Sequence, residues 1–145
     1  MSAPPAHDDE VRAHAVLCSE DDIALLVHAF YARVRADPVL GPIFDARIHD
    51  WDAHLVKLVD FWSSALLHTR RFNGAPLPRH AAMSGLSADL FRRWLRIFRD
   101  VAAAQSNRAM AERAVMLAER IAQGLWLGYQ LAHTPHALPQ PLLHG

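Results

Sequence analysis

Four long segments carry apolar side chains at intervals of three and four residues, and this spacing constrains the fold more than any other feature of the sequence. An α-helix has 3.6 residues per turn, so side chains at these intervals lie on one face. Each segment therefore predicts an amphipathic helix that buries one side. The segments begin at Ser19, about Asp50, Ser87 and after Ser106, and they end near Asp37, Leu67, Ala104 and Tyr129.

The ends of these segments carry the residue types that start and stop helices. Ser19 and Ser87 are good N-cap residues, because a serine hydroxyl accepts a hydrogen bond from a free backbone N–H of the first turn. Pro38 and the Gly41–Pro42 pair end the first helix and leave room for only a short helical turn before Phe44. No run alternates polar and apolar residues between hairpin turns, so we expect no sheet. The predicted fold class is all-α.

The length of 145 residues predicts one domain, and a hydrophobic content of 52% is enough for a full core at this size. Residues 1–18 are rich in Ala, Pro and Asp at first, and we expect a flexible segment there. Residues 132–145, "AHTPHALPQPLLHG", contain three prolines and predict a flexible tail. The folded domain is expected over 19–131.

The charge balance and the single cysteine narrow the class of protein. Lys+Arg and Asp+Glu number 15 each, so we expect neither a nucleic-acid nor a membrane partner. Cys18 has no second cysteine to pair with, which favours a reducing cytoplasm. The first ten residues do not resemble a signal peptide, and no apolar run reaches the roughly 20 residues that a membrane span needs. We expect a cytoplasmic monomer or weak dimer.

One histidine lies in an unusual context. His80 follows "TRRFNGAPLPR" (69–79), a connection of about eleven residues whose two prolines and glycine resist helix formation. An irregular segment of that length inside a compact helical domain usually has a function, and a packed cofactor would supply one. Three other histidines are expected in solvent at helix faces or ends: His28, His49 and His68.

Three groups with hydrogen-bonding capacity occupy otherwise apolar helical faces. They are Tyr31, His54 and Trp94, and they come from three different predicted helices. A buried phenol or indole needs a hydrogen-bond partner, so one such residue is ordinary. Three of them together predict a shared pocket that holds a polar ligand. The other aromatic residues on these faces, Trp51, Trp62 and Phe98, are interpreted as packing.

The sequence resembles the group III truncated haemoglobins over about residues 20–130. The resemblance rests on four runs in the family's order and at consistent spacings: "FYARVRADPVLGPIF" (30–44), "WDAHLVKLVDFW" (51–62), "NGAPLPRH" (73–80) and "LFRRWLRIF" (90–98). Each run alone is a weak signal, whereas the ordered set is fairly specific. The resemblance implies a shortened globin, in which a two-over-two helical sandwich surrounds haem b.

The resemblance also implies roles for individual residues. His80 would be the proximal ligand of the iron, since ferrous haem in globins takes a neutral imidazole on one side. Tyr31, His54 and Trp94 would line the opposite, ligand-binding face. The porphyrin would be contacted by Phe44, Leu58, Phe61 and Met83, and a haem propionate by Arg79.

These roles predict a site that binds O2, NO, CO or peroxide and releases O2 slowly. Each hydrogen bond from a phenol or an indole to the ligand is worth on the order of 1–2 kcal/mol in a dry pocket. Two donors would slow O2 release by roughly tens-fold to a thousandfold. The resemblance therefore favours NO dioxygenation, peroxidase-like chemistry or ligand sensing over bulk O2 transport, with an unidentified reductase as partner.

Two other classes of protein are compatible with parts of the sequence. A helical interaction module, or a haem-based sensor that signals to a partner, is the main alternative, although a single domain leaves no room for an output domain. A non-haem metal enzyme is the weaker one. Asp50 and His54 stand four residues apart, but Asp50 is explained more simply as a helix cap. The other apolar faces carry no carboxylate, as a metal site within a helical bundle would require.

Overall fold

The computed structural model describes residues 17–68 and 85–142, which fold into five helices. These are α2 (Glu20–Ala36), α3 (Leu40–Asp45), α4 (Trp51–Leu67), α6 (Ala88–Ala103) and α7 (Arg108–His133). No residue in these two ranges belongs to a strand, so the all-α prediction is confirmed there. None of these helices has the length and apolar character that crossing a membrane requires.

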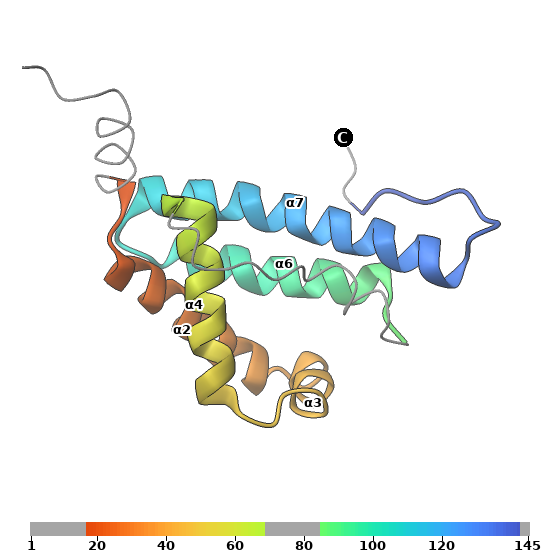
Figure 1. The fold of residues 1–145 in the computed structure, drawn as a ribbon, viewed down its shortest axis with the longest axis horizontal. Coiled ribbons are helices and arrows are strands. Elements are labelled where there is room, and N and C mark those ends of the chain that lie inside the picture. Colours follow the sequence, from red (N-terminus) through yellow and green to blue (C-terminus); the bar gives the residue numbers. More distant parts are fainter. Residues whose placement is uncertain (1–16, 69–84, 143–145) are drawn as a thin grey trace, which may run out of the picture.

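The helices form two layers of two (Figure 1). In one layer α6 and α7 lie side by side and run in opposite directions, and in the other α2 lies against α4. Helix α2 also packs on α6 and so joins the layers, while α4 contacts α7 over a short stretch. In the described part of the chain the backbones of α4 and α6 have no extensive contact.

Side-chain caps begin the long helices where the sequence predicts. The Ser19 hydroxyl accepts from the N–H of Asp22 at 3.1 Å, and the Asp22 carboxylate accepts from the N–H of Ser19 at 3.0 Å. Asp50 caps α4 by accepting from a backbone N–H at 3.1 Å, and Ser87 caps α6 in the same way at 3.3 Å. The cap of α7 is Asn107. Each cap satisfies an N–H that has no partner within its helix.

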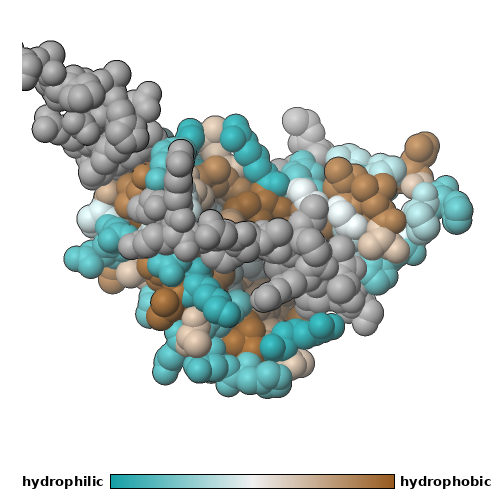
Figure 2. All heavy atoms as spheres, in the orientation of Figure 1, coloured by the Kyte–Doolittle hydropathy of each residue, from teal (hydrophilic) through white to brown (hydrophobic). Residues whose placement is uncertain are grey.

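The core forms where the two layers meet. Its largest fully buried side chains come from α2, α4, α6 and α7 and include Phe30, Leu26, Leu66, Leu95, Phe98 and Met110. Helix α7 faces α6 largely with alanines, which are buried and recur at intervals of three and four: Ala111, Ala114, Ala118 and Ala122. Small side chains let two helix backbones approach closely, so α7 supports α6 along much of its length. Some apolar side chains stay at the surface toward the C-terminal end of α7, among them Leu127 and Leu131. Figure 2 shows that hydrophobic and hydrophilic residues are interspersed over the face of the molecule that it draws.

The short helix α3 folds back on the end of α2, and it extends further than the sequence suggested. It includes both Pro42 and Phe44, because a proline in the first turn of a helix removes no intrahelical hydrogen bond. Gly41 makes the approach possible. A Cβ atom at this position would lie 2.5 Å from the carbonyl oxygen of Arg35, closer than any side chain tolerates. This close contact aims Phe44 back toward α2.

The C-terminal tail also differs from the prediction. Helix α7 continues to His133, and the chain then folds back until Leu142 is 1% exposed. The buried side chain of Gln130 accepts from the N–H of Gln140 at 2.7 Å and donates to its carbonyl oxygen at 3.0 Å. The side chain of Gln123 accepts from the N–H of Leu142 at 3.0 Å. The expectation of an unstructured tail is therefore wrong for the end of the described residues, because glutamine side chains replace the missing backbone partners.

One ion pair ties the end of α2 to α6. The Asp37 carboxylate accepts two hydrogen bonds from Arg93, at 2.8 and 2.9 Å, and two more from the backbone N–H groups of Val39 and Leu40. Such two-pronged pairs are the strong form of the arginine–carboxylate interaction. The hydrogen bonds from Arg93, together with those from the backbone, lower the pKa of Asp37 to about 2. The pair fixes the position of α6 relative to the end of α2, at the residue directly before Trp94.

We expect Asp37→Asn to lower the free energy of unfolding by about 2 kcal/mol at pH 7, because a low pKa in the folded state means that folding favours the charged carboxylate. The stabilisation is complete above the ordinary carboxyl pKa of about 4 and fades as the pH falls from about 4 to about 2. Urea unfolding at several pH values, followed by circular dichroism, measures this. The control is Asp89→Ala, which removes an exposed carboxylate and should change stability by less than about 0.5 kcal/mol. An equal effect of both variants would contradict the prediction.

Candidate functional site

The phenol of Tyr31 lies at the centre of the candidate site. Its side chain points from α2 into the core and is 6% exposed. Three rings from α3 and α4 surround it, with centroids 6.1 Å away for Phe44, 6.1 Å for Trp51 and 6.5 Å for His54. The structure thus brings together Tyr31 and His54, two of the three groups that the sequence placed in one pocket.

Trp94 of α6 completes the set. Its indole lies near enough to the Tyr31 hydroxyl to lower the pKa of the phenol as a hydrogen-bond donor does, and Phe30 lies edge-on to both rings, at 4.7 Å from Tyr31 and 5.1 Å from Trp94. An indole N–H can only donate, so the phenol oxygen is the acceptor. The phenolic proton then remains available for a second partner. Three helices therefore contribute one polar group each to the same place.

The pKa of Tyr31 decides which form of the phenol is present. Burial raises this pKa far above its usual range, and the hydrogen bond from Trp94 offsets only part of the rise. Removing a charge from water is costly in such surroundings, so the ionised phenolate is strongly disfavoured. Tyr31 accordingly keeps its proton throughout the physiological pH range and can act as a hydrogen-bond donor.

A row of stacked rings holds Trp94 in place. Its indole stacks on Phe98 with a centroid distance of 5.7 Å and an interplanar angle of 22°, and Phe98 stacks on Trp62 of α4 at 5.2 Å and 21°. Trp62 and Phe98 are almost completely buried, which confirms that they pack the core. Stacking against the buried Phe98 ring favours the orientation in which the Trp94 indole faces Tyr31.

The site also offers apolar surface that the core does not use. The side chains of Phe44, Leu58 and Phe61 pack against the core but stay only partly buried. The same is true of three large side chains on α7: Leu117, Ile121 and Leu125. Apolar side chains left partly exposed on several helices, beside a few polar groups that converge, are typical of a site for a largely apolar ligand. Of these residues Phe44 lies against Tyr31, so it is the described side chain best placed to contact an apolar cofactor on that side.

Three of the predicted site residues cannot be placed in this geometry. His80, Arg79 and Met83 lie outside the residues that the structure describes. The remaining candidates are Tyr31, His54, Trp94, Phe44, Leu58 and Phe61. The first four belong to one connected set of ring contacts around Tyr31, and Phe61 joins the same set at its far end through Trp62 and Phe98. Leu58 and Phe61 lie one and two turns further along α4 than His54.

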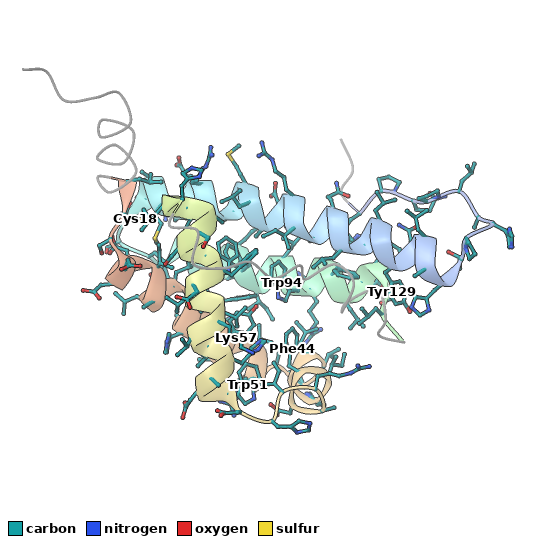
Figure 3. The ribbon with its side chains drawn as sticks, in the orientation of Figure 1. Cys18, Phe44, Trp51, Lys57, Trp94 and Tyr129 are labelled. Carbon is teal, nitrogen blue, oxygen red and sulfur yellow. The ribbon has the colours of Figure 1, made fainter. Side chains whose placement is uncertain are left out.

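Trp51 contacts the site in addition to packing. The sequence predicts a packing role, and the half-buried side chain does pack against the core. Its ring also lies 5.8 Å from His54 and 6.5 Å from Phe44, a contact that the packing interpretation did not include. Figure 3 shows Trp51 at the start of α4, with Phe44 beside it. Its position three residues before His54, on the same face of a helix, was the available signal.

Comparison with known proteins gives a consistent result. No protein-family model matches the chain. The chain is 32% identical over 108 residues to the group 3 truncated hemoglobin ctb of Campylobacter jejuni, a match that covers 72% of this chain and 85% of that protein. Its structure is similar to the crystal structure of group III truncated hemoglobin from Campylobacter jejuni, with a TM-score of 0.72 and 28% identity over 83% of this chain and 96% of the other. Sequence and structure thus point to the same relative over most of both chains.

Proposed function

Because the chain belongs to the group III truncated haemoglobins, which are haem-binding globins, we propose that it binds O2 and other small diatomic ligands and releases O2 slowly. The observation that supports this proposal most directly is the buried Tyr31 phenol with the partly buried Trp94 indole beside it. Their two donors face a site bordered by apolar side chains, and the phenol keeps its proton. Such a pocket stabilises a ligand that accepts hydrogen bonds and excludes water that would compete for them.

The proposal assigns haem b as the cofactor, which supplies a ferrous iron able to bind a diatomic ligand. His80 would hold the iron through its imidazole, with the other ring nitrogen donating to a backbone carbonyl. Phe44, Leu58, Phe61 and Met83 would contact the porphyrin. Arg79 would pair with a propionate.

Slow release follows from the strength of the two hydrogen bonds. The Tyr31 hydroxyl donates to the ligand, and the Trp94 indole either donates to the ligand directly or keeps the phenol oriented. With about 1–2 kcal/mol for each donor, O2 would leave about fivefold to thirtyfold more slowly if Tyr31 alone donates to it, and tens-fold to a thousandfold more slowly if the indole turns from the phenol to the ligand as well. A site that holds O2 for this long suits NO dioxygenation, peroxidase-like chemistry or sensing better than transport. The first two activities would require a reductase as partner.

His54 would control the mouth of the pocket or contact the ligand itself. Its side chain is half-buried, and its ring is perpendicular to that of Tyr31, with an interplanar angle of 90°. An imidazole in this position can donate to a ligand beside Tyr31, or turn outward to open a path from solvent. Both roles use the same ring at the edge of the pocket.

Absorption spectra of the purified protein test the proposed function. We expect a Soret band in the oxidised and reduced forms, and a shifted band when CO is added to the reduced form. A CO-sensitive band would indicate that haem held by His80 can bind a diatomic ligand, which the Tyr31 hydroxyl would then stabilise. A folded, colourless protein that does not take up added haem would contradict the proposal and favour a helical interaction module instead.

A further inference from the structure

Three side chains from three helices form a cluster at the edge of the candidate site, and we call Arg35, Asp45 and Trp51 the rim cluster. The Trp51 indole Nε1 donates to Asp45 Oδ1 at 3.0 Å. The Arg35 guanidinium carbon lies 4.5 Å from the centroid of the Trp51 ring, and its Nε lies 3.9 Å from the same Asp45 oxygen. The cluster joins the ends of α2 and α3 to the first residue of α4.

The rim cluster lies between solvent and the rings that surround Tyr31. The Arg35 and Asp45 side chains are 48% and 55% exposed. The Trp51 ring, in contrast, also contacts the buried Tyr31 and the half-buried His54. Its centroid lies 6.1 Å from that of Tyr31 and 5.8 Å from that of His54, to whose ring it is nearly perpendicular, at 88°. The Trp51 indole therefore contacts Arg35 and Asp45 on its solvent side and Tyr31 and His54 on its inner side.

The hydrogen bond and the cation–π contact matter more for orientation than for stability. An exposed ion pair between Arg35 and Asp45 contributes little to folding, because water screens it. Trp51, however, is the first residue of α4, where no preceding helical turn restrains a side chain. A donor bond from the indole edge, combined with a cation near the ring, leaves one orientation favoured over the others. In that orientation the ring lies against His54.

We infer that Trp51 is a positioning residue that keeps the His54 ring next to Tyr31 and narrows the path of small ligands into the pocket, and that Asp45 holds Trp51 in this position. The inference rests on the proposed function, because it concerns access to the ligand site. It does not require His54 to lack other contacts. It requires only that movement of the indole frees space beside the imidazole.

Substitutions at Asp45 and Trp51 separate the effect of the indole hydrogen bond from the effect of the Asp45 charge. Asp45→Ala removes both the acceptor for the indole and the partner of Arg35, whereas Asp45→Asn keeps an acceptor oxygen and removes the charge. Trp51→Phe keeps a ring and removes the N–H, and Trp51→Ala removes the side chain that narrows the path. Asp52→Ala is the matched control, since Asp52 is the next residue and is exposed.

Association of CO with the reduced, haem-loaded protein after flash photolysis measures access. We expect Asp45→Ala and Trp51→Phe to raise the association rate about threefold to tenfold, and Trp51→Ala to raise it at least tenfold, because each change widens the path past His54. Asp45→Asn and Asp52→Ala should stay within about twofold of the unaltered protein. Unchanged rates in both Asp45→Ala and Trp51→Ala would overturn the inference.

A second readout does not depend on ligand binding. In NMR spectra, nuclear Overhauser effects between the His54 and Tyr31 rings should weaken in Asp45→Ala, and the Trp51 indole N–H should exchange faster with solvent. If the nuclear Overhauser effects between His54 and Tyr31 are as strong in Asp45→Ala as in the unaltered protein, the positioning role is contradicted, whether or not haem is bound. Failure of the unaltered protein to take up haem would instead reject the proposed function, so the two failures can be told apart.

Discussion

Replacement of His80 by alanine is expected to remove stable haem binding. If this imidazole is the protein's bond to the iron, its loss leaves only apolar contacts and propionate pairing to hold the porphyrin. Loss of a residue that only hydrogen-bonds to a metal ligand weakens metal binding about tenfold to a hundredfold. Loss of the ligand itself should cost more, so we expect haem to dissociate more than about a hundredfold faster. Transfer of haem to an excess of a competing apo-globin, followed through the Soret band, measures the rate.

Two controls make the result specific to position 80. His49→Ala and His28→Ala remove histidines that the structure confirms as exposed, and they should leave haem dissociation unchanged. In His80→Gly, added imidazole should restore the spectrum of the unaltered protein, because a free ring can enter the space left by the side chain. Retention of haem by His80→Ala, with an unaltered spectrum, would reject His80 as the ligand.

Tyr31→Phe is expected to raise the rate of O2 dissociation about fivefold to thirtyfold, which corresponds to losing one hydrogen bond of about 1–2 kcal/mol. Ionisation of Tyr31 should add no pH dependence to this rate between about pH 6 and pH 9, since burial raises the pKa of Tyr31 well above this range. Displacement of O2 by excess CO in a stopped-flow instrument measures both effects.

The second tyrosine of the chain provides the control. The Tyr129 hydroxyl accepts from the backbone N–H of Leu86 at 3.2 Å, and its ring stacks with Trp126 and His133 rather than with the candidate site. Tyr129→Phe should therefore leave O2 dissociation unchanged. An equal rate for Tyr31→Phe and the unaltered protein would exclude Tyr31 as the donor. Trp94→Phe would then show whether the indole alone holds the ligand.

Much of the fold could be predicted because it depends on local chemistry. Helix periodicity and caps act over three or four residues, so Ser19, Asp50 and Ser87 determined where α2, α4 and α6 begin. Part of the site was predictable for the same reason. Tyr31, His54 and Trp94 stood out because hydrogen-bonding groups on apolar faces need partners, and the structure places them around one point.

The sequence by itself determined the all-α class, the limits of the long helices and the polar groups that would have to share a pocket. Only the tertiary structure decided that Trp51 touches His54 and Asp45, that Gly41 lets α3 return to α2, and that Gln130 holds the tail. The reason is physical: local preferences depend on neighbours along the chain, whereas these contacts depend on how separate helices pack. A hydrogen bond between residues on different helices forms only after packing has brought both partners together. The pattern of neighbouring residues in the sequence therefore does not predict it.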